Sequence, residues 1–122
     1  MDIIISNSSE EPIYEQLVKQ IKNLIMSGEL SEGQILPSIR NLSRGLQISA
    51  ITTKRAYDEL EREGYIITRQ GKGTYISAQN KEIMEEMRLR IVEGKLSEAV
   101  DAGKSIGLNL EQMQKMLKLL YE

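Results

Sequence analysis

Basic side chains gather in one part of this chain, and the chemistry open to them is the binding of phosphate groups. Between Leu36 and Ile76 seven basic residues stand against four acidic ones, whereas the whole chain of 122 residues has a net charge of -2. The basic residues are Arg40, Arg44, Lys54, Arg55, Arg62, Arg69 and Lys72, and the acidic ones are Asp58, Glu59, Glu61 and Glu63. Because the net charge gives no general attraction to nucleic acid, any affinity for DNA must come from this local excess.

Other kinds of site have little support in the composition. The chain has no cysteine and no histidine, which excludes disulfides, thiolate nucleophiles, imidazole acid-base chemistry and zinc ligands other than carboxylates. Ser38 with Arg40, or Glu85 with Glu86, can be paired on paper, but neither pair has a histidine or a metal cluster around it. We expect no enzyme, no metal and no other cofactor. The apolar start Ile3–Ile5 is too short to span a bilayer, so we also expect no membrane partner and a cytoplasmic protein.

A first helix and a loop are predicted before the basic region. Residues 12–27 repeat apolar side chains at the spacing of one helical face, with Pro12 at the first helical position and Gly28 as the stop. We interpret this helix as a core element without a ligand. The segment Leu30 to Leu36 contains a glycine and precedes Pro37, which favours a loop.

Two further helices carry most of the basic side chains. The second is predicted to open at Ser38, with apolar residues spaced for burial along one side, and Gln47–Ile48 make the turn that follows. Ser49 is a good N-cap for the third helix, because its hydroxyl can accept hydrogen bonds from backbone amides of the first turn. This order is typical of a helix-turn-helix.

The third helix is predicted to present one face to the core and another to solvent. The residues at the spacing of a buried face are Thr53, Ala56, Tyr57 and Leu60. Those on the opposite face are Ile51, Arg55, Asp58 and Arg62, flanked by Thr52 and Lys54. An isoleucine pointing outward near a helix start suits contact with a thymine methyl group in the major groove.

A tight basic hairpin is predicted directly after this helix. Residues 65–69 and 74–77 are rich in β-branched and aromatic side chains, and Gln70–Gly73 can turn tightly because both glycines accept positive φ. Arg69 and Lys72 supply charge at a tip whose backbone can approach a phosphate or a minor groove. The predicted fold is therefore mainly α with a small β-hairpin, a winged helix-turn-helix over residues 1–78.

The combined motifs resemble the DNA-binding domain of the GntR transcription regulators over about 65 residues. The matching residues are Leu36–Ser38, Arg40, Leu42, Ile48–Tyr57, Leu60, Glu63–Gly64 and Gln70–Thr74. The resemblance implies that DNA contacts fall on Arg40, Ser49, Ala50, Ile51, Thr52, Lys54, Gln70 and Gly71. The charge pattern adds Arg44, Arg55 and Lys72 as further candidates, and the bare backbone of the hairpin tip adds Gly73. Many members of the family have arginine where this chain has Ala50, so we expect apolar, A/T-type contacts there in place of a guanine contact.

The remaining residues 79–122 are predicted to form two amphipathic helices. The first runs from Lys81 to about Gly103 with Ile83, Met84, Met87, Ile91, Leu96, Ala99 and Val100 on a broad stripe. Gly107 ends it, and Asn109 with Gln112 has the pattern of a capping box. The second stripe consists of Leu110, Met113, Met116, Leu117 and Leu120. Two short helices cannot bury such faces alone, so we expect them to pack on each other and on a second copy as a dimerisation tail.

This short tail resembles the YtrA subfamily of the GntR regulators. The resemblance implies a homodimer that represses an operon encoding an ABC transporter, and a two-fold protein implies a palindromic double-stranded DNA operator. Three alternatives stay open: tail helices that fold back on a monomer, a winged domain that binds proteins without binding DNA, and a small-molecule effector between the tails. For the effector, methionines offer adaptable apolar walls, although at helical spacing they more often form core.

Overall fold

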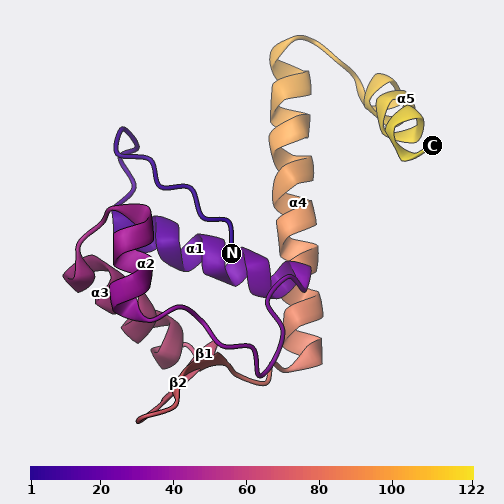
Figure 1. Cartoon of the computed structure of the whole chain (residues 1–122). Coiled ribbons are helices and arrows are strands. Elements are labelled where there is room, and N and C mark those ends of the chain that lie inside the picture. The colour runs from indigo at the N-terminus through magenta and orange to yellow at the C-terminus, as the bar shows by residue number, and fades with distance from the viewer. The chain divides into compact units, whose positions relative to one another are not determined.

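The computed structural model describes residues 1–122 and contains five helices and one two-stranded hairpin (Figure 1). In chain order the elements are α1 (Ile13–Ser27), α2 (Ile39–Leu46), α3 (Ala50–Arg62), β1 (Ile66–Arg69), β2 (Gly73–Ile76), α4 (Lys81–Ser105) and α5 (Leu110–Tyr121). The chain divides into two compact units, Met1–Asn80 and Lys81–Glu122. The winged helix-turn-helix lies within the first unit, and both tail helices lie in the second.

The helix α1 is the core helix that the apolar spacing predicted. Leu17 and Ile21 are completely buried, and α1 packs against α3. Gly28 ends the helix with φ 86°, where its N–H donates to the carbonyl oxygen of Ile25 at 3.2 Å. Pro12 lies one position earlier than predicted, as the residue before the first helical one. Its missing N–H is no loss at either position, since helix starts leave their first N–H groups without a helical partner.

The turn between α2 and α3 is the tight one that a helix-turn-helix requires. Gln47 ends α2 in the left-handed region with φ 56°, the one residue other than glycine with positive φ. Each helix starts at a serine cap: Ser38 Oγ accepts from the N–H of Asn41 at 3.1 Å, and Ser49 Oγ accepts from the N–H of Thr52 at 3.0 Å. These caps satisfy amides that the helices cannot pair themselves.

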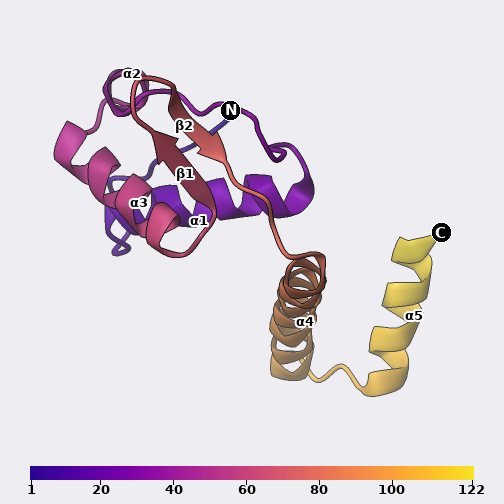
Figure 2. The ribbon, with the colours of Figure 1, turned by 90° about the horizontal axis from the view of Figure 1, so that it is seen from below.

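The hairpin follows α3 with little intervening chain (Figure 2). Gly64 carries φ 86° where α3 ends, and the antiparallel register pairs Ile66 with Ile76 and Arg69 with Gly73. At the tip the N–H of Lys72 donates to the carbonyl oxygen of Arg69 at 2.9 Å, and Gly71 between them has φ 76°. That is the conformation that the third position of a type II turn requires, and glycine adopts it without strain.

The segment predicted as a plain loop before α2 also takes part in this sheet. The N–H of Leu36 donates to the carbonyl oxygen of Thr74 at 2.8 Å, and the N–H of Ile76 donates to that of Gln34 at 2.9 Å. Ile35 and Tyr75 form an antiparallel bridge. The segment is a loop as predicted, with one bridge residue at Ile35, and the prediction did not include its hydrogen bonds to β2. The partner strand lies some forty residues away, so local turn signals could not reveal the pairing.

The core of the first unit takes apolar residues from every element. The buried set comprises Leu17, Ile21, Ile25, Leu30, Leu36, Leu42, Ala56, Tyr57, Leu60, Tyr65, Ile66 and Ile76. Every buried side-chain nitrogen and oxygen has a hydrogen-bond partner, as expected of a well-packed interior. This core fixes the angle at which α3 is held and so decides which of its side chains face outward.

In the second unit, α4 and α5 meet at a close corner. Gly107 (φ 80°) ends the turn after α4 with its N–H on the carbonyl oxygen of Lys104, and the N–H of Leu108 donates to Gly103. Asn109 and Gln112 form the predicted capping box. Gly103 lies so near Met113 that an added Cβ would stand 2.5 Å from the Met113 sulfur. Beyond this corner the apolar side chains of α5 remain exposed, so α5 does not cover its own stripe against α4.

Candidate nucleic-acid interface

The first turn of α3 presents the outward edge that the helical spacing predicted. Ile51 is 83% exposed, whereas Thr53, Ala56, Tyr57 and Leu60 on the opposite face are all buried. Ser49, Ala50, Lys54 and Arg55 are exposed and Thr52 is half-buried. An isoleucine this exposed, at the start of a capped helix, is free to contact another molecule.

Buried polar contacts hold α3 against α2 and the segment before it. The Ser43 Oγ lies 2.8 Å from Thr53 Oγ1 and 2.6 Å from the carbonyl oxygen of Ile39. The hydroxyl of Tyr57 donates to the carbonyl oxygen of Pro37 at 2.7 Å. Burial raises the pKa of Tyr57 well above its usual range, so the hydroxyl keeps its proton and remains a donor. These bonds give the helix-turn-helix one fixed geometry.

The basic side chains of α2 and of the first half of α3 are all exposed but differ in their partners. Arg40 and Arg44 on α2 form no ion pair within the chain. Lys54 pairs with Asp58 one turn further along α3, with Nζ 2.8 Å from Oδ2. Arg55 places its guanidinium 3.7 Å from the centre of the Tyr14 ring, which comes from α1. An exposed pair such as Lys54–Asp58 contributes little and exchanges readily for another partner.

The acidic half of α3 is internally satisfied. Each of the four carboxylates Asp58, Glu59, Glu61 and Glu63 accepts a hydrogen bond from within the chain. The donors are, in order, Lys54, Arg62, the backbone N–H of Thr68, and Lys22. The Arg62 guanidinium also lowers the pKa of Glu59. Each of these carboxylates thus already has a donor within the chain.

The hairpin tip is open and internally braced. Gln70, Gly71, Lys72 and Gly73 are all exposed, and the Tyr75 hydroxyl donates to the carbonyl oxygen of Lys72. The Thr68 and Thr74 hydroxyls lie 3.1 Å apart across the two strands. Gly73 has φ 99°, and an added Cβ there would stand 3.3 Å from the Ile35 side chain, closer than an ordinary van der Waals contact. The tip therefore exposes the glycine backbone and the Lys72 side chain, and hydrogen bonds between the two strands hold it in shape.

The tail presents apolar side chains of both helices to solvent. On α4 the predicted dimerisation residues Ile83 and Ile91 are exposed and Met87 is half-buried, whereas Met84 is only 5% exposed. Met84 is thus already covered within a single chain. On α5 the predicted residues are exposed except for the half-buried Met113, and the exposed ones are Leu110, Met116, Leu117 and Leu120.

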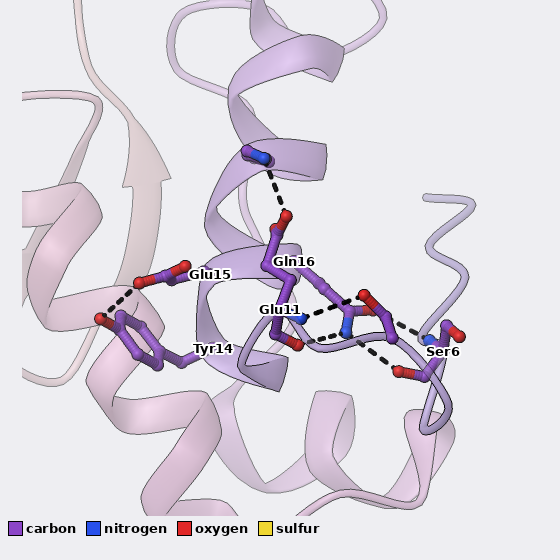
Figure 3. A network of polar contacts seen from close by, with 7 residues as sticks. Ser6, Glu11, Tyr14, Glu15 and Gln16 are labelled. Atoms are coloured by element: carbon purple, nitrogen blue, oxygen red, sulfur yellow. Dashed lines mark hydrogen bonds and ion pairs between the residues drawn. The ribbon is translucent and has the colours of Figure 1, made fainter.

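Sequence reasoning missed Tyr14 and the N-terminal arm, by which we mean residues 1–12. The Gln16 side chain accepts from the N–H of Ser6 at 2.9 Å and donates to the carbonyl oxygens of Ser6 and Glu11 at 3.0 and 2.9 Å (Figure 3). One helical turn later Gln20 holds Ile4 in the same two-sided way. Gln16 and Gln20, four residues apart and near Tyr14, were the signal in the sequence. A search for apolar periodicity does not consider such polar residues.

No helix of the chain is long and apolar enough to cross a membrane, and no group of three or more acidic residues could hold a metal ion.

Comparison with known proteins agrees with this geometry. The family described as bacterial regulatory proteins, gntR family, matches residues 13–76. The HTH-type transcriptional repressor YtrA of Bacillus subtilis is 36% identical over 95% of this chain and 89% of its own length. These relatives are transcription regulators and not enzymes.

Solved structures extend the likeness to the tail. A transcriptional regulator from Oenococcus oeni has a TM-score of 0.77 at 29% identity, covering 97% of this chain and 98% of that one. YtrA from Sulfolobus acidocaldarius, a GntR-family transcription factor, has a TM-score of 0.60 at 34% identity, covering 75% of this chain and 97% of that one. The similarity to the first protein therefore includes both tail helices as well as the winged domain.

Proposed function

Because this chain belongs to the GntR family of DNA-binding transcription regulators and is YtrA-like within it, we propose that it is a homodimeric repressor of a palindromic operator. In this proposal residues 1–78 form the DNA-binding domain and residues 79–122 the dimerisation tail. The observation that carries the proposal is the outward edge of α3 from Ile51 to Arg55, with Ile51 83% exposed.

Base recognition is assigned to the first turn of α3. A helix enters the major groove with its N-terminal residues against the base edges, and here those residues are Ser49, Ala50, Ile51 and Thr52. Ala50 and Ile51 offer methyl groups, which suit the methyl group of thymine. The Ser49 and Thr52 hydroxyls lie 2.8 Å apart and can serve as donors or acceptors. We therefore expect A/T-rich half-sites.

Phosphate binding is assigned to the basic side chains around that turn and to the hairpin tip. Arg40 and Arg44 come from α2, and Lys54 and Arg55 from α3; at the tip, Lys72 adds charge beside the exposed backbone of Gln70, Gly71 and Gly73. Backbone contacts set the register of a protein on DNA and carry no sequence information themselves. They make the affinity fall steeply as salt concentration rises.

Dimerisation is assigned to the tail. On α5, Leu110, Met116, Leu117 and Leu120 form one exposed apolar stripe that α4 does not cover. Contiguous apolar surface of this kind marks an interaction site in a folded protein. A second copy presents the same stripe, and a two-fold pairing of the tails brings two winged domains to two half-sites.

Repression is supported by the similarity to the Bacillus subtilis relative, whose name describes a transcriptional repressor. We extend the proposal to an operon encoding an ABC transporter on the strength of the resemblance to the YtrA subfamily. A regulator of this kind works where the DNA is, so we place the protein in the cytoplasm.

The proposal is tested by footprinting the full chain across the genome and measuring its affinity for the recovered sites. We expect palindromic A/T-rich half-sites upstream of transport genes, and a loss of at least tenfold in affinity for the K54A/R55A double variant. The matched control is K115A/K118A, which removes two lysines from the tail helix α5. Equal affinity of the K54A/R55A variant and the wild type would contradict the assignment of α3.

A further inference from the structure

The aromatic ring of Tyr14 and the guanidinium of Arg55 form a contact between α1 and α3. The guanidinium carbon lies 3.7 Å from the ring centre, within the range of a favourable cation–π interaction. Arg55 belongs to the outward edge of α3, and its side chain is exposed. The ring therefore supports a basic side chain on the surface that we assign to DNA.

The Tyr14 side chain has one further contact, and the start of its helix is held by the N-terminal arm. Its hydroxyl donates to Glu15 Oε1 at 3.1 Å, and this bond raises the pKa of Tyr14. The N-terminal arm is fastened to the same end of α1 by Gln16, which binds Ser6 and Glu11 (Figure 3). Hydrogen bonds between Gln16 and backbone groups of the N-terminal arm thus hold the first turn of α1, the turn that carries Tyr14.

The contact with the ring leaves the N–H donors of Arg55 without a hydrogen-bond partner in the chain. A guanidinium that stacks uses its flat face, whereas its N–H donors point outward in the plane and match the oxygens of a phosphate. Lys54 offers the contrast, because its ammonium is engaged end-on by Asp58 at 2.8 Å. The charge of Lys54 is partly offset by the Asp58 carboxylate, whereas Arg55 forms no ion pair within the chain.

We propose that Tyr14 is a positioning residue for DNA binding: its ring holds the Arg55 guanidinium in the orientation that binds one phosphate beside the major groove. An arginine side chain loses considerable rotamer freedom when it is fixed. Stacking on Tyr14 removes part of that freedom before DNA arrives, which lowers the cost of binding. This inference rests on the proposed placement of α3 against DNA.

The test uses the full chain and a labelled DNA duplex of random sequence, since a phosphate contact acts on any sequence. Affinity is measured over a range of NaCl concentrations for the wild type and for Tyr14→Leu, Tyr14→Phe, Arg55→Ala and the Y14L/R55A double variant. We expect Tyr14→Leu to weaken binding about two- to fivefold, the range given by an exposed cation–π contact. Tyr14→Phe keeps the ring and should bind like the wild type.

The double variant separates positioning from general support of the fold. If Tyr14 acts through Arg55, adding Tyr14→Leu to Arg55→Ala changes nothing further, and Arg55→Ala lowers the slope of log affinity against log salt by about one. An equal loss on Tyr14→Leu with and without Arg55, or no loss at all, overturns the inference. Thermal unfolding of each variant shows whether the fold is retained.

Arg40→Ala distinguishes the two proposals, because Arg40 lies on α2 and has no contact with Tyr14 among the interactions described above. Weaker binding by Arg40→Ala beside unchanged binding by Tyr14→Leu would sink only the role of Tyr14. Unchanged binding by Arg40→Ala and Arg55→Ala together would sink the DNA surface and this inference with it.

Discussion

The Ser43 hydroxyl lies 2.8 Å from the Thr53 hydroxyl, inside the contact between α2 and α3. Both residues are buried. The Thr53 hydroxyl donates to the carbonyl oxygen of Ser49, and Ser43 has one proton, which it can donate either to Thr53 Oγ1 or to the carbonyl oxygen of Ile39. The pair therefore ties the two helices of the helix-turn-helix together while satisfying both polar groups. It fixes how far α3 can turn about its own axis, and so which side chains reach DNA.

Thr53→Val should loosen this joint with almost no change in volume. The substitution removes the acceptor that Ser43 faces and puts a methyl group beside a polar atom, at a cost of about 1 kcal/mol in the free energy of unfolding. Urea denaturation measures the loss. Ser105→Ala is the control, since the Ser105 hydroxyl makes a similar bond to Ala102 at an exposed position, and it should change stability by less than about 0.5 kcal/mol. Equal effects of the two variants would contradict a role for the buried pair.

Tyr57→Phe should destabilise the fold and remove a dependence on pH. Loss of the hydroxyl leaves the carbonyl oxygen of Pro37 without its donor, which costs about 1–2 kcal/mol. Burial raises the pKa of Tyr57 above the ordinary tyrosine value of 10.0, so above that pH the unfolded chain releases this proton while the native state retains it. Stability from this group is therefore complete below about pH 10 and is lost as pH rises further. To check this, the free energy of unfolding of the wild type and of Tyr57→Phe is measured in urea at pH 8 and at pH 10.5.

The control for that experiment is Tyr121→Phe, because Tyr121 is an exposed residue at the end of α5. This variant should keep the stability and the alkaline pH dependence of the wild type. A wild-type pH dependence that persists unchanged in Tyr57→Phe would show that other groups cause it.

Leu117→Glu should split the proposed dimer. Leu117 belongs to the exposed apolar stripe of α5, and a buried unpaired carboxylate at an interface is strongly unfavourable. Leu119→Glu is the matched control, because Leu119 lies about 200° further round the same helix and outside that stripe. Light scattering after size-exclusion chromatography should find monomers for Leu117→Glu and dimers for the wild type and Leu119→Glu. Dimers in all three samples would mean that the tails do not pair through this stripe.

Two glycines of α4 should respond to different extents to alanine. Nothing lies within 4 Å of a Cβ added at Gly94, whereas one added at Gly103 would stand 2.5 Å from the Met113 sulfur. Gly94→Ala should stabilise the helix by up to about 1 kcal/mol through its better helix propensity. Gly103→Ala must displace the flexible end of the Met113 side chain, so it should gain less than Gly94→Ala does. Thermal unfolding should place the Gly94 variant above the Gly103 variant; the reverse order would refute the close approach.

Most of the helices and the outward edge of α3 could be predicted from residues close together in the chain. The serine caps at Ser38 and Ser49, the capping box at Asn109 and the glycine stops act within a single turn, so their patterns are visible without a fold. The spacing of Thr53, Ala56, Tyr57 and Leu60 similarly fixed which face of α3 is buried, and Ile51 followed on the other face.

The tail helices show the limit of local patterns. The apolar spacing of α5 was visible in the sequence, but that spacing does not identify the surface that covers these side chains. Met84 lies on the predicted stripe of α4 and is nevertheless covered within the single chain.

The order of the helices and hairpin, the turn at Gln47, and the basic residues around an open Ile51 follow from local patterns in the chain. Three features appear only in the folded protein: Gln34–Leu36 pairs with β2, Gln16 and Gln20 bind the N-terminal arm, and Tyr14 contacts Arg55. The reason is physical: caps and helical faces depend on neighbours within about four residues. The pairing of Leu36 with Thr74 or of Tyr14 with Arg55 depends instead on the angles at which whole elements pack, and those angles are set by the core as a unit.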